Sequence, residues 1–200
     1  DLVTTAGISR VVTVDVHAGQ IQGFFNIPVD HIFAAPIFIQ HIKEKYAGED
    51  IVIVSPDAGG MERARSYAKM LDAALAMTDK RRPNPNVAEI MNVIGDVEGK
   101  TAILVDDLVD TAGTAIQAGK AILREGAKRV SLCSTHGVLS GNAIQRITES
   151  SLEEIILTDT IPQTQHAADC DKIRVISIAN LLGEAIKRIA TGESISSLFN

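Results

Sequence analysis

Aromatic residues are scarce in this sequence: they make up 4% of its 200 residues, and tryptophan is absent. Because 46% of the residues are hydrophobic, there is enough apolar material for a core, and that core must be aliphatic. Only two cysteines occur, Cys133 and Cys170. They are too few for a disulfide framework and lack the spacing of metal ligands. Cys133 ends a largely apolar run, so we expect a buried free thiol and a reducing, cytoplasmic setting.

An excess of positive charge is also missing. The 19 Lys and Arg residues are outnumbered by 25 Asp and Glu, which gives a net charge of −6 and argues against a general nucleic-acid binder. No apolar run approaches the roughly 20 residues of a membrane-spanning helix, and the first residues do not resemble a signal peptide. The sequence also contains no P-loop, no dinucleotide-binding glycine pattern after its first strand and no nucleophile elbow, which excludes those chemistries.

Short apolar runs alternate with segments of helical periodicity, which is typical of right-handed βαβ units and a mostly parallel sheet flanked by helices. The runs that predict strands are 10–16, 51–54, 74–77, 102–105, 129–134, 154–157 and 173–176. The segments that predict helices are 35–46, 60–71, 114–125, 141–146 and 181–190. Residues 1–7 have the pattern of the last turns of a helix that ends at Gly7. The length allows one large domain, or one and a half small ones.

The most informative segment is 101–114. The apolar run 102–105 leads directly into Asp106 and Asp107, and a turn of small residues, 110–114, then opens a predicted helix. Ligands of parallel sheets bind just beyond the carboxyl ends of the strands, and backbone N–H groups at a helix N-terminus bind phosphate. The two carboxylates suit ribose hydroxyls or a hydrated Mg²⁺. The segment therefore predicts a pocket for a phosphorylated ribose.

Three further polar clusters follow predicted strands. Asp57 lies in 55–63, where the sequence leaves open a tight turn capped by Asp or a second phosphate or Mg²⁺ site. We expect Glu62 and Arg63, in the following helix, to be surface or packing residues. The segment 15–25 contains Asp15, His17, Gln20 and Gln22, and His17 is either structural or a metal or nucleotide contact. In 135–142, His136 can face the pocket, although a turn in which Ser140 caps the next helix is the simpler interpretation.

The segment 79–86 has the most loop-like composition in the sequence, because two prolines and two asparagines disfavour regular structure. Three consecutive cations, 80–82, lie near its start. Composition alone leaves two interpretations open: a solvated basic turn, or a mobile lid that brings cations onto a phosphate.

Taken together, these segments resemble a known family. Residues 105–114 resemble the PRPP-binding signature of phosphoribosyltransferase-like folds of type I, and 15–25 resembles the signature of ribose-phosphate pyrophosphokinases. Segments 55–60, 79–83 and 194–199 match the same family in the same order. The resemblance covers the whole chain. It implies a phosphoribosyltransferase-like α/β fold and an enzyme that transfers diphosphate from ATP to the C1 hydroxyl of ribose 5-phosphate, giving PRPP and AMP.

The resemblance also implies roles for individual residues. The 5-phosphate would be held by the loop formed by Asp110, Thr111, Ala112, Gly113 and Thr114. Asp106 and Asp107 would hold the ribose hydroxyls directly or through Mg²⁺, the implied cofactor. His17 and Asp57 fall on metal-associated positions. Lys80 and Arg82 fall on a flexible catalytic loop, where Arg82 also contacts ribose 5-phosphate, while Arg81 between them points the other way if the loop is extended.

Regulation and assembly are implied as well. The family binds ADP and phosphate at an allosteric site between subunits, and four residues fall on its positions: Gln22, Asp30, Ser194 and Ser196. Two positions depart from many relatives, because Gly19 replaces a serine and His31 an asparagine. The family forms homohexamers, so we expect a homo-oligomer with ATP and ribose 5-phosphate as partners, and neither nucleic acid nor membrane.

The resemblance divides the chain into three parts. Residues 1–33 would end a first phosphoribosyltransferase-like domain, 34–180 would form a second one with the ribose 5-phosphate site, and 181–200 would pack back on the first. We therefore expect the chain to be a fragment that needs an N-terminal half for ATP binding. Two alternatives are a non-catalytic, synthetase-like regulatory module and a phosphoribosyltransferase that uses PRPP.

Overall fold

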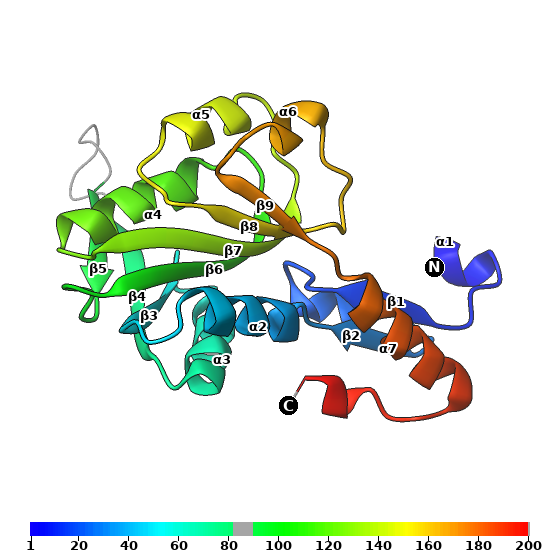
Figure 1. Cartoon of the computed structure of the whole chain (residues 1–200). Coiled ribbons are helices and arrows are strands. Elements are labelled where there is room, and N and C mark those ends of the chain that lie inside the picture. The colour runs from blue at the N-terminus through cyan, green and yellow to red at the C-terminus, as the bar shows by residue number, and fades with distance from the viewer. Residues whose placement is uncertain (82–89, 200) are drawn as a thin grey trace.

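The computed structural model describes residues 1–81 and 90–199. Its main feature is a seven-stranded sheet with the order β5-β4-β3-β6-β7-β8-β9, in which only β5 is antiparallel to its neighbour, β4 (Figure 1). The strands are β3 (Ile51–Ser55), β4 (Ala74–Arg81), β5 (Ile90–Ile94), β6 (Thr101–Val109), β7 (Arg129–Gly137), β8 (Ile155–Thr158) and β9 (Ile173–Ile176). The predicted α/β class with a mostly parallel sheet is confirmed.

Helices cover both faces of this sheet (Figure 1). Helices α2 (Ala35–Lys45) and α3 (Met61–Leu71) pack on one face, and α4 (Gly113–Arg124), α5 (Ala143–Glu149) and the short α6 (Gln165–Ala168) lie on the other. Successive strand residues point to opposite faces, so in β6 Leu104 joins the core under α4, and Ile103 and Val105 join the core under α2 and α3. Burial on both faces explains why central strands are continuous apolar runs.

Both cysteines are buried and free, as predicted for Cys133. Burial raises the pKa of the Cys133 thiol well above its usual range. A thiol held in its neutral form is a poor nucleophile and a poor metal ligand, so Cys133 acts as a packing residue.

A smaller sheet lies beside the main one. Strand β1 (Val11–Val14) pairs in parallel with β2 (Val29–Ile32), and the 3₁₀ helix η1 (Gly19–Phe24) connects them. Helix α1 (Leu2–Thr5) precedes β1, and Gly7 just after it has φ 91°, the left-handed conformation expected of a residue that ends a helix.

Helix α7 (Ala179–Thr191) and the 3₁₀ helix η2 (Ser196–Leu198) lie next to the small sheet. The Phe33 and Phe199 rings meet edge to face at 5.8 Å, which joins the end of the chain to the end of β2. The assignment of 1–33 and 181–200 to a first domain stays a prediction. None of the helices within 1–81 and 90–199 combines the length and apolarity needed to cross a membrane.

The structure contains elements that were not predicted: strands β2 and β5, the short helix α6, and the 3₁₀ helices η1 and η2. In addition, β4 continues through Lys80 to Arg81 where a loop was expected. The continuation has a physical cause: Asp79 pairs with Asn92 and Lys80 with Met91, so an antiparallel partner supplies the hydrogen bonds that keep these polar residues extended. The part of the predicted loop from 82 to 86, with Arg82, lies outside the described residues.

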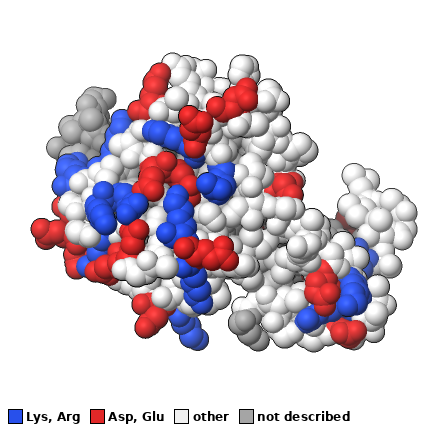
Figure 2. Space-filling model, viewed as in Figure 1, with Lys and Arg blue, Asp and Glu red and all other residues white. Residues whose placement is uncertain are grey.

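Charged side chains of both signs are mixed on the surface. The face in Figure 2 carries Lys and Arg close to Asp and Glu, with no extended patch of one sign. Ion pairs account for part of this mixing: Arg129 Nη2 lies 3.0 Å from Glu49 Oε1, and Lys45 Nζ lies 2.6 Å from Oε2 of the buried Glu154.

A glycine in α4 tests how closely this helix packs. A Cβ added at Gly119 would lie 2.5 Å from Cδ2 of the buried Leu152. We expect Gly119→Ala to lower the free energy of unfolding by about 1–3 kcal/mol through overpacking. Gly183→Ala in α7 is the matched control, because a Cβ there meets nothing within 4 Å; it should raise stability by about 0.5–1 kcal/mol. Urea unfolding of both variants measures this, and similar effects at the two positions would contradict close packing of α4.

Candidate functional site

Two adjacent aspartates form the centre of the candidate site. Asp106 and Asp107 lie near the carboxyl end of β6, a central strand of the main sheet. Asp107 is 4% exposed, and the Asp106 side chain is partly buried. The backbone N–H of Asp107 donates to Asp106 Oδ1 at 2.9 Å, which fixes the orientation of the Asp106 carboxylate. The sheet thus presents two carboxylates at the edge where ligands of parallel sheets bind.

Two side chains from distant segments converge on Asp107. Arg63 Nη1, from the first turn of α3, lies 2.9 Å from Asp107 Oδ1 and 3.5 Å from Asp106 Oδ1. His17, which follows β1, places Nδ1 3.0 Å from Asp107 Oδ2. The prediction that Arg63 is a surface or packing residue was wrong. β3 and β6 are parallel neighbours, so the helix that follows β3 starts at the same edge as the two aspartates.

The environment shifts the pKa values of the two carboxyl groups in opposite directions. Burial, with the side-chain hydrogen bond between the two carboxyl groups next in importance, raises the pKa of Asp106 to about 7, although the backbone N–H of Asp107 acts to lower it. Burial also acts to raise the pKa of Asp107, but the charge of Arg63 and the hydrogen bond with His17 outweigh it, so the pKa of Asp107 lies below its usual value. Near neutral pH, Asp107 is therefore ionised, while Asp106 is present in both its protonated and its ionised form.

The turn after β6 exposes the start of α4. Asp110 and Thr111 are exposed, and Ala112 is buried with φ 60°, in the left-handed region. Gly113 and Thr114 begin a helix of 12 residues whose N-cap position has no side-chain hydrogen bond. The first N–H groups of α4 are therefore not capped by a side chain, which is the arrangement in which helix N-termini bind anions.

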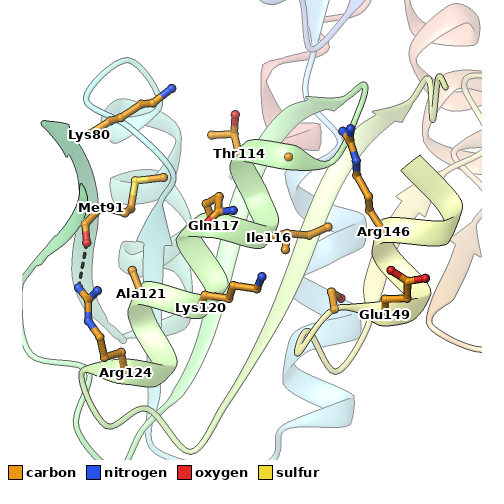
Figure 3. A pocket seen from close by; sticks show the side chains of 12 residues that line it. Lys80, Met91, Thr114, Ile116, Gln117, Lys120, Ala121, Arg124, Arg146 and Glu149 are labelled. Carbon is orange, nitrogen blue, oxygen red and sulfur yellow. Dashed lines mark hydrogen bonds between the residues drawn. The ribbon is translucent and has the colours of Figure 1, made fainter. Parts of the chain in front are cut away.

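A hollow of about 830 Å³ extends from this turn along the outer side of α4 (Figure 3). Gly113 and Thr114 line it at one end, together with Lys80 from β4 and Arg146 from α5. Arg146 Nη1 donates to the backbone carbonyl of Thr111 at 3.2 Å. At the other end, Arg124 Nη2 donates to the backbone carbonyl of Met91 at 3.0 Å, drawn as a dashed line in Figure 3.

Asp57 contacts the turn that follows β3. Its Oδ1 accepts a hydrogen bond from the backbone N–H of Gly60 at 3.0 Å, so the structure shows the turn-capping contact. His17 and Asp57 were both predicted to be metal-associated. In the part of the chain that the structure describes, the side chain of His17 contacts Asp107 and that of Asp57 contacts Gly60, so no shared hydrogen-bond partner links the two residues.

The donor set can be compared with the needs of Mg²⁺. Within 1–81 and 90–199, no group of three or more His, Cys, Asp or Glu side chains is arranged to hold a metal. Mg²⁺ often binds through one or two carboxylates, with waters and substrate phosphates completing its shell. The pair Asp106 and Asp107 has that character, so the residues fit an ion shared with a substrate and not a closed site made of protein alone.

His136 and Asp15 secure the segment that carries His17. His136 Nε2 lies 2.9 Å from the carbonyl oxygen of Val14, and its Nδ1 lies 2.9 Å from Thr160 Oγ1. The buried Asp15 carboxylate accepts hydrogen bonds at 2.8 Å from the backbone N–H of Ala34 and from Thr135 Oγ1. His136 therefore holds the end of β1 against β7.

The predicted capping role of Ser140 was wrong. Helix α5 begins at Ala143, after Asn142, and its N-cap makes no side-chain hydrogen bond. Backbone contacts stabilise the turn instead: the N–H of Ser140 donates to the carbonyl of Asp110 at 3.1 Å, which ties this turn to the loop after β6.

The residues predicted to bind ADP and phosphate lie on the small sheet and near the chain end. Gln22 in η1 donates to the carbonyl of Gly19 at 3.2 Å, and Asp30 in β2 forms an ion pair with Arg10. The backbone N–H of Ser196 donates to Ser194 Oγ at 3.3 Å. His31 Nδ1 lies 2.8 Å from Thr13 Oγ1, a contact between β2 and β1.

Comparison with known proteins places this geometry in a family. A family model described as phosphoribosyl synthetase-associated domain matches residues 80–200. The ribose-phosphate pyrophosphokinase of Caldanaerobacter subterraneus subsp. tengcongensis is 57% identical over 199 residues, covering 100% of this chain and 63% of the relative. The ribose-phosphate pyrophosphokinase of Hyphomonas neptunium is 54% identical over 201 residues, covering 100% of this chain and 64% of the relative.

A solved structure agrees with these sequences. The crystal structure of phosphoribosylpyrophosphate synthetase from Mycobacterium smegmatis superimposes with a TM-score of 0.88 at 43% identity, over 96% of this chain and 62% of that one. The chain spans less than two thirds of the length of each of these relatives. With the fold, the aspartate pair and these matches in agreement, the chain belongs to the phosphoribosyl synthetase-associated domain family and is similar over its length to ribose-phosphate pyrophosphokinases.

Proposed function

We propose that this chain binds ribose 5-phosphate and forms the acceptor half of a ribose-phosphate diphosphokinase. In this reaction the C1 hydroxyl of ribose 5-phosphate attacks the β-phosphorus of ATP, the bond between the α- and β-phosphates breaks, and PRPP and AMP form. One observation carries the proposal: a carboxylate pair lies at the carboxyl end of β6, just before the uncapped N-terminus of α4, in a chain of this family.

The geometry supports separate roles for the residues of the site. The N–H groups of Gly113 and Thr114 would bind the 5-phosphate, and the preceding loop residues Asp110, Thr111 and Ala112 would shape its cradle. The ionised Asp107 would accept hydrogen bonds from ribose hydroxyls, and Asp106 would do so when deprotonated. Diphosphoryl transfer depends on positioning and on neutralising phosphate charge. Lys80 in β4 would supply one positive charge, as would Arg82, which lies outside the described residues.

Mg²⁺ is proposed as the cofactor, held by the carboxylate pair with His17 and Asp57 as further candidates. When bound, it would neutralise charge on the phosphates of ATP. Regulation by ADP and phosphate through Gln22, Asp30, Ser194 and Ser196, assembly into a homohexamer and a cytoplasmic location are proposals of the same kind. The close relation to ribose-phosphate pyrophosphokinases supports them.

Product analysis separates this proposal from its two rivals. The chain is incubated with Mg²⁺ and either ATP plus ribose 5-phosphate or PRPP plus free bases, and its affinity for ribose 5-phosphate is measured by calorimetry. AMP and PRPP from the first mixture support diphosphoryl transfer. A nucleoside monophosphate from the second would show a phosphoribosyltransferase instead. Binding of ribose 5-phosphate without either product is the result expected of an acceptor half by itself, and the non-catalytic role would be favoured only if AMP did not form in the complete enzyme either. A chain that does not bind ribose 5-phosphate would contradict the proposal.

Replacement of Lys80 tests whether its charge acts in substrate binding or in the transition state. We expect Lys80→Ala to abolish AMP formation by the complete enzyme while the affinity for ribose 5-phosphate stays within a few-fold, because removing a charge that acts only in the transition state lowers kcat without changing substrate binding. Lys120→Ala is the matched control, since Lys120 lines the same hollow farther along α4. An equal loss of turnover and affinity in Lys80→Ala would contradict this role.

A further inference from the structure

We propose that Arg146 binds the 5-phosphate of ribose 5-phosphate together with the N-terminus of α4. The inference rests on the proposed function and adds a residue to its substrate site. Arg146 lies on α5, 32 positions beyond Thr114 (146 − 114), so no local motif connects it with the phosphate loop. The fold alone brings the two together.

The guanidinium of Arg146 lies beside the start of α4. Its Nη1 donates to the backbone carbonyl of Thr111 at 3.2 Å, and a Cβ built on Gly113 would lie 4.0 Å from the same Nη1. Figure 3 shows the side chain extending from α5 toward the first turn of α4, on the side where Thr114 lies. A phosphate on the N–H groups of this turn would therefore be within reach of the guanidinium.

Arg146 keeps most of its hydrogen-bonding capacity for a ligand. A guanidinium has five N–H donors, and the only hydrogen bond that the Arg146 side chain makes among residues 1–81 and 90–199 is the one to Thr111. In that same part of the chain it forms no ion pair: Glu149, one turn farther along α5, accepts a hydrogen bond from Gln145 at 2.9 Å instead. A permanent positive charge that has no counter-ion among the described residues is suited to a phosphate, which it can bind through two parallel N–H···O bonds.

Arg124 provides an internal comparison. It lines the same hollow and also donates to a backbone carbonyl, that of Met91, at 3.0 Å. It lies 11 positions after Gly113 on α4 (124 − 113), which is about 16 Å along a helix. Its guanidinium is also 3.4 Å from Glu125 Oε1, so its charge has a partner. Arg124 thus matches Arg146 in residue type and bonding but is far from the phosphate loop.

Calorimetry with ribose 5-phosphate tests the proposal. We expect Arg146→Gln to weaken binding by about 10–100-fold, the effect of losing a charged hydrogen bond, and Arg146→Lys to restore part of it. Arg124→Gln should stay within about two-fold of the unchanged chain. Equal affinities of the unchanged chain and Arg146→Gln would overturn the assignment. If the unchanged chain does not bind ribose 5-phosphate, the proposed function fails and the role of Arg146 fails with it, whereas loss of the Arg146 effect alone leaves the proposed function intact.

A second measurement separates phosphate contact from mere support of the loop. The ³¹P resonance of saturating, bound ribose 5-phosphate is followed against pH in the unchanged chain and in Arg146→Gln. The second pKa of a phosphate monoester is about 6, and an adjacent guanidinium lowers it by favouring the dianion. We expect this bound-state pKa to rise in Arg146→Gln and not in Arg124→Gln. An unchanged phosphate pKa alongside weakened binding would show that Arg146 only braces Thr111 and would overturn direct contact.

Discussion

Arg63→Met is expected to lower the free energy of unfolding by about 3–5 kcal/mol near pH 8, because removing one partner of a buried ion pair leaves an uncompensated charge. The side chain of Arg63 is 22% exposed and that of its partner Asp107 is 6% exposed. Methionine keeps most of the apolar stem of arginine, so the charge is the main change. Arg65→Met is the control: Arg65 is exposed on the same helix and should change stability by less than about 0.5 kcal/mol.

The pH dependence of this effect follows from the lowered pKa of Asp107. A carboxyl group with a folded-state pKa below its unfolded value stabilises the fold above the unfolded pKa, and the contribution is lost as the pH falls through the folded value. The difference between Arg63→Met and the unchanged chain should therefore be large near pH 8 and shrink in acid. Urea unfolding at several pH values measures it. A difference that does not vary with pH would show that Arg63 acts through packing and not through charge.

Asp106→Asn is expected to stabilise the fold by about 2–4 kcal/mol near pH 8 in metal-free buffer. The pKa of Asp106 is raised from 3.8 to about 7, so its ionisation opposes folding above that value. The penalty is absent below the unfolded pKa, where the group is protonated in both states, and it is complete above about pH 7. The stabilisation should accordingly appear between these limits as the pH rises.

The same substitution is expected to weaken binding of ribose 5-phosphate, because an amide offers hydroxyl groups one neutral acceptor oxygen where an ionised carboxylate offers two charged ones. Asp110→Asn is the matched control for stability, since Asp110 is exposed in the loop that follows. Thermal unfolding across the pH range, paired with calorimetry, measures both effects. Asp106→Asn with unchanged stability near pH 8 would contradict a carboxylate held in an unfavourable environment.

Much of the fold could be predicted because the central strands are buried on both faces. The run 102–105 forms a buried part of β6. Its composition is entirely apolar, unlike that of a loop. β2 and β5 were missed for a different reason: each lies at a sheet edge, contains polar residues such as Asp30 and Asn92, and depends on its partner strand. Pairing with another strand is a tertiary effect that the periodicity within one segment does not record.

Part of the candidate site could likewise be predicted from the sequence, and part of it could not. The positions of the two carboxylates and of the small-residue turn before α4 could be predicted because 106–114 is one continuous segment at a strand end. Arg63 was misjudged, because its role depends on the parallel pairing of β3 with β6. The contact of His17 with Asp107 joins residues 90 positions apart, so only the folded chain shows that His17 lies at the aspartate pair.

A crystal structure of this chain with ribose 5-phosphate would show whether 106–114 is the substrate site. We expect the 5-phosphate within hydrogen-bonding distance of the N–H groups of Gly113 and Thr114, and the ribose hydroxyls on Asp106 and Asp107. Ribose 5-phosphate bound elsewhere, or a sugar whose hydroxyls point away from both carboxylates, would contradict this assignment.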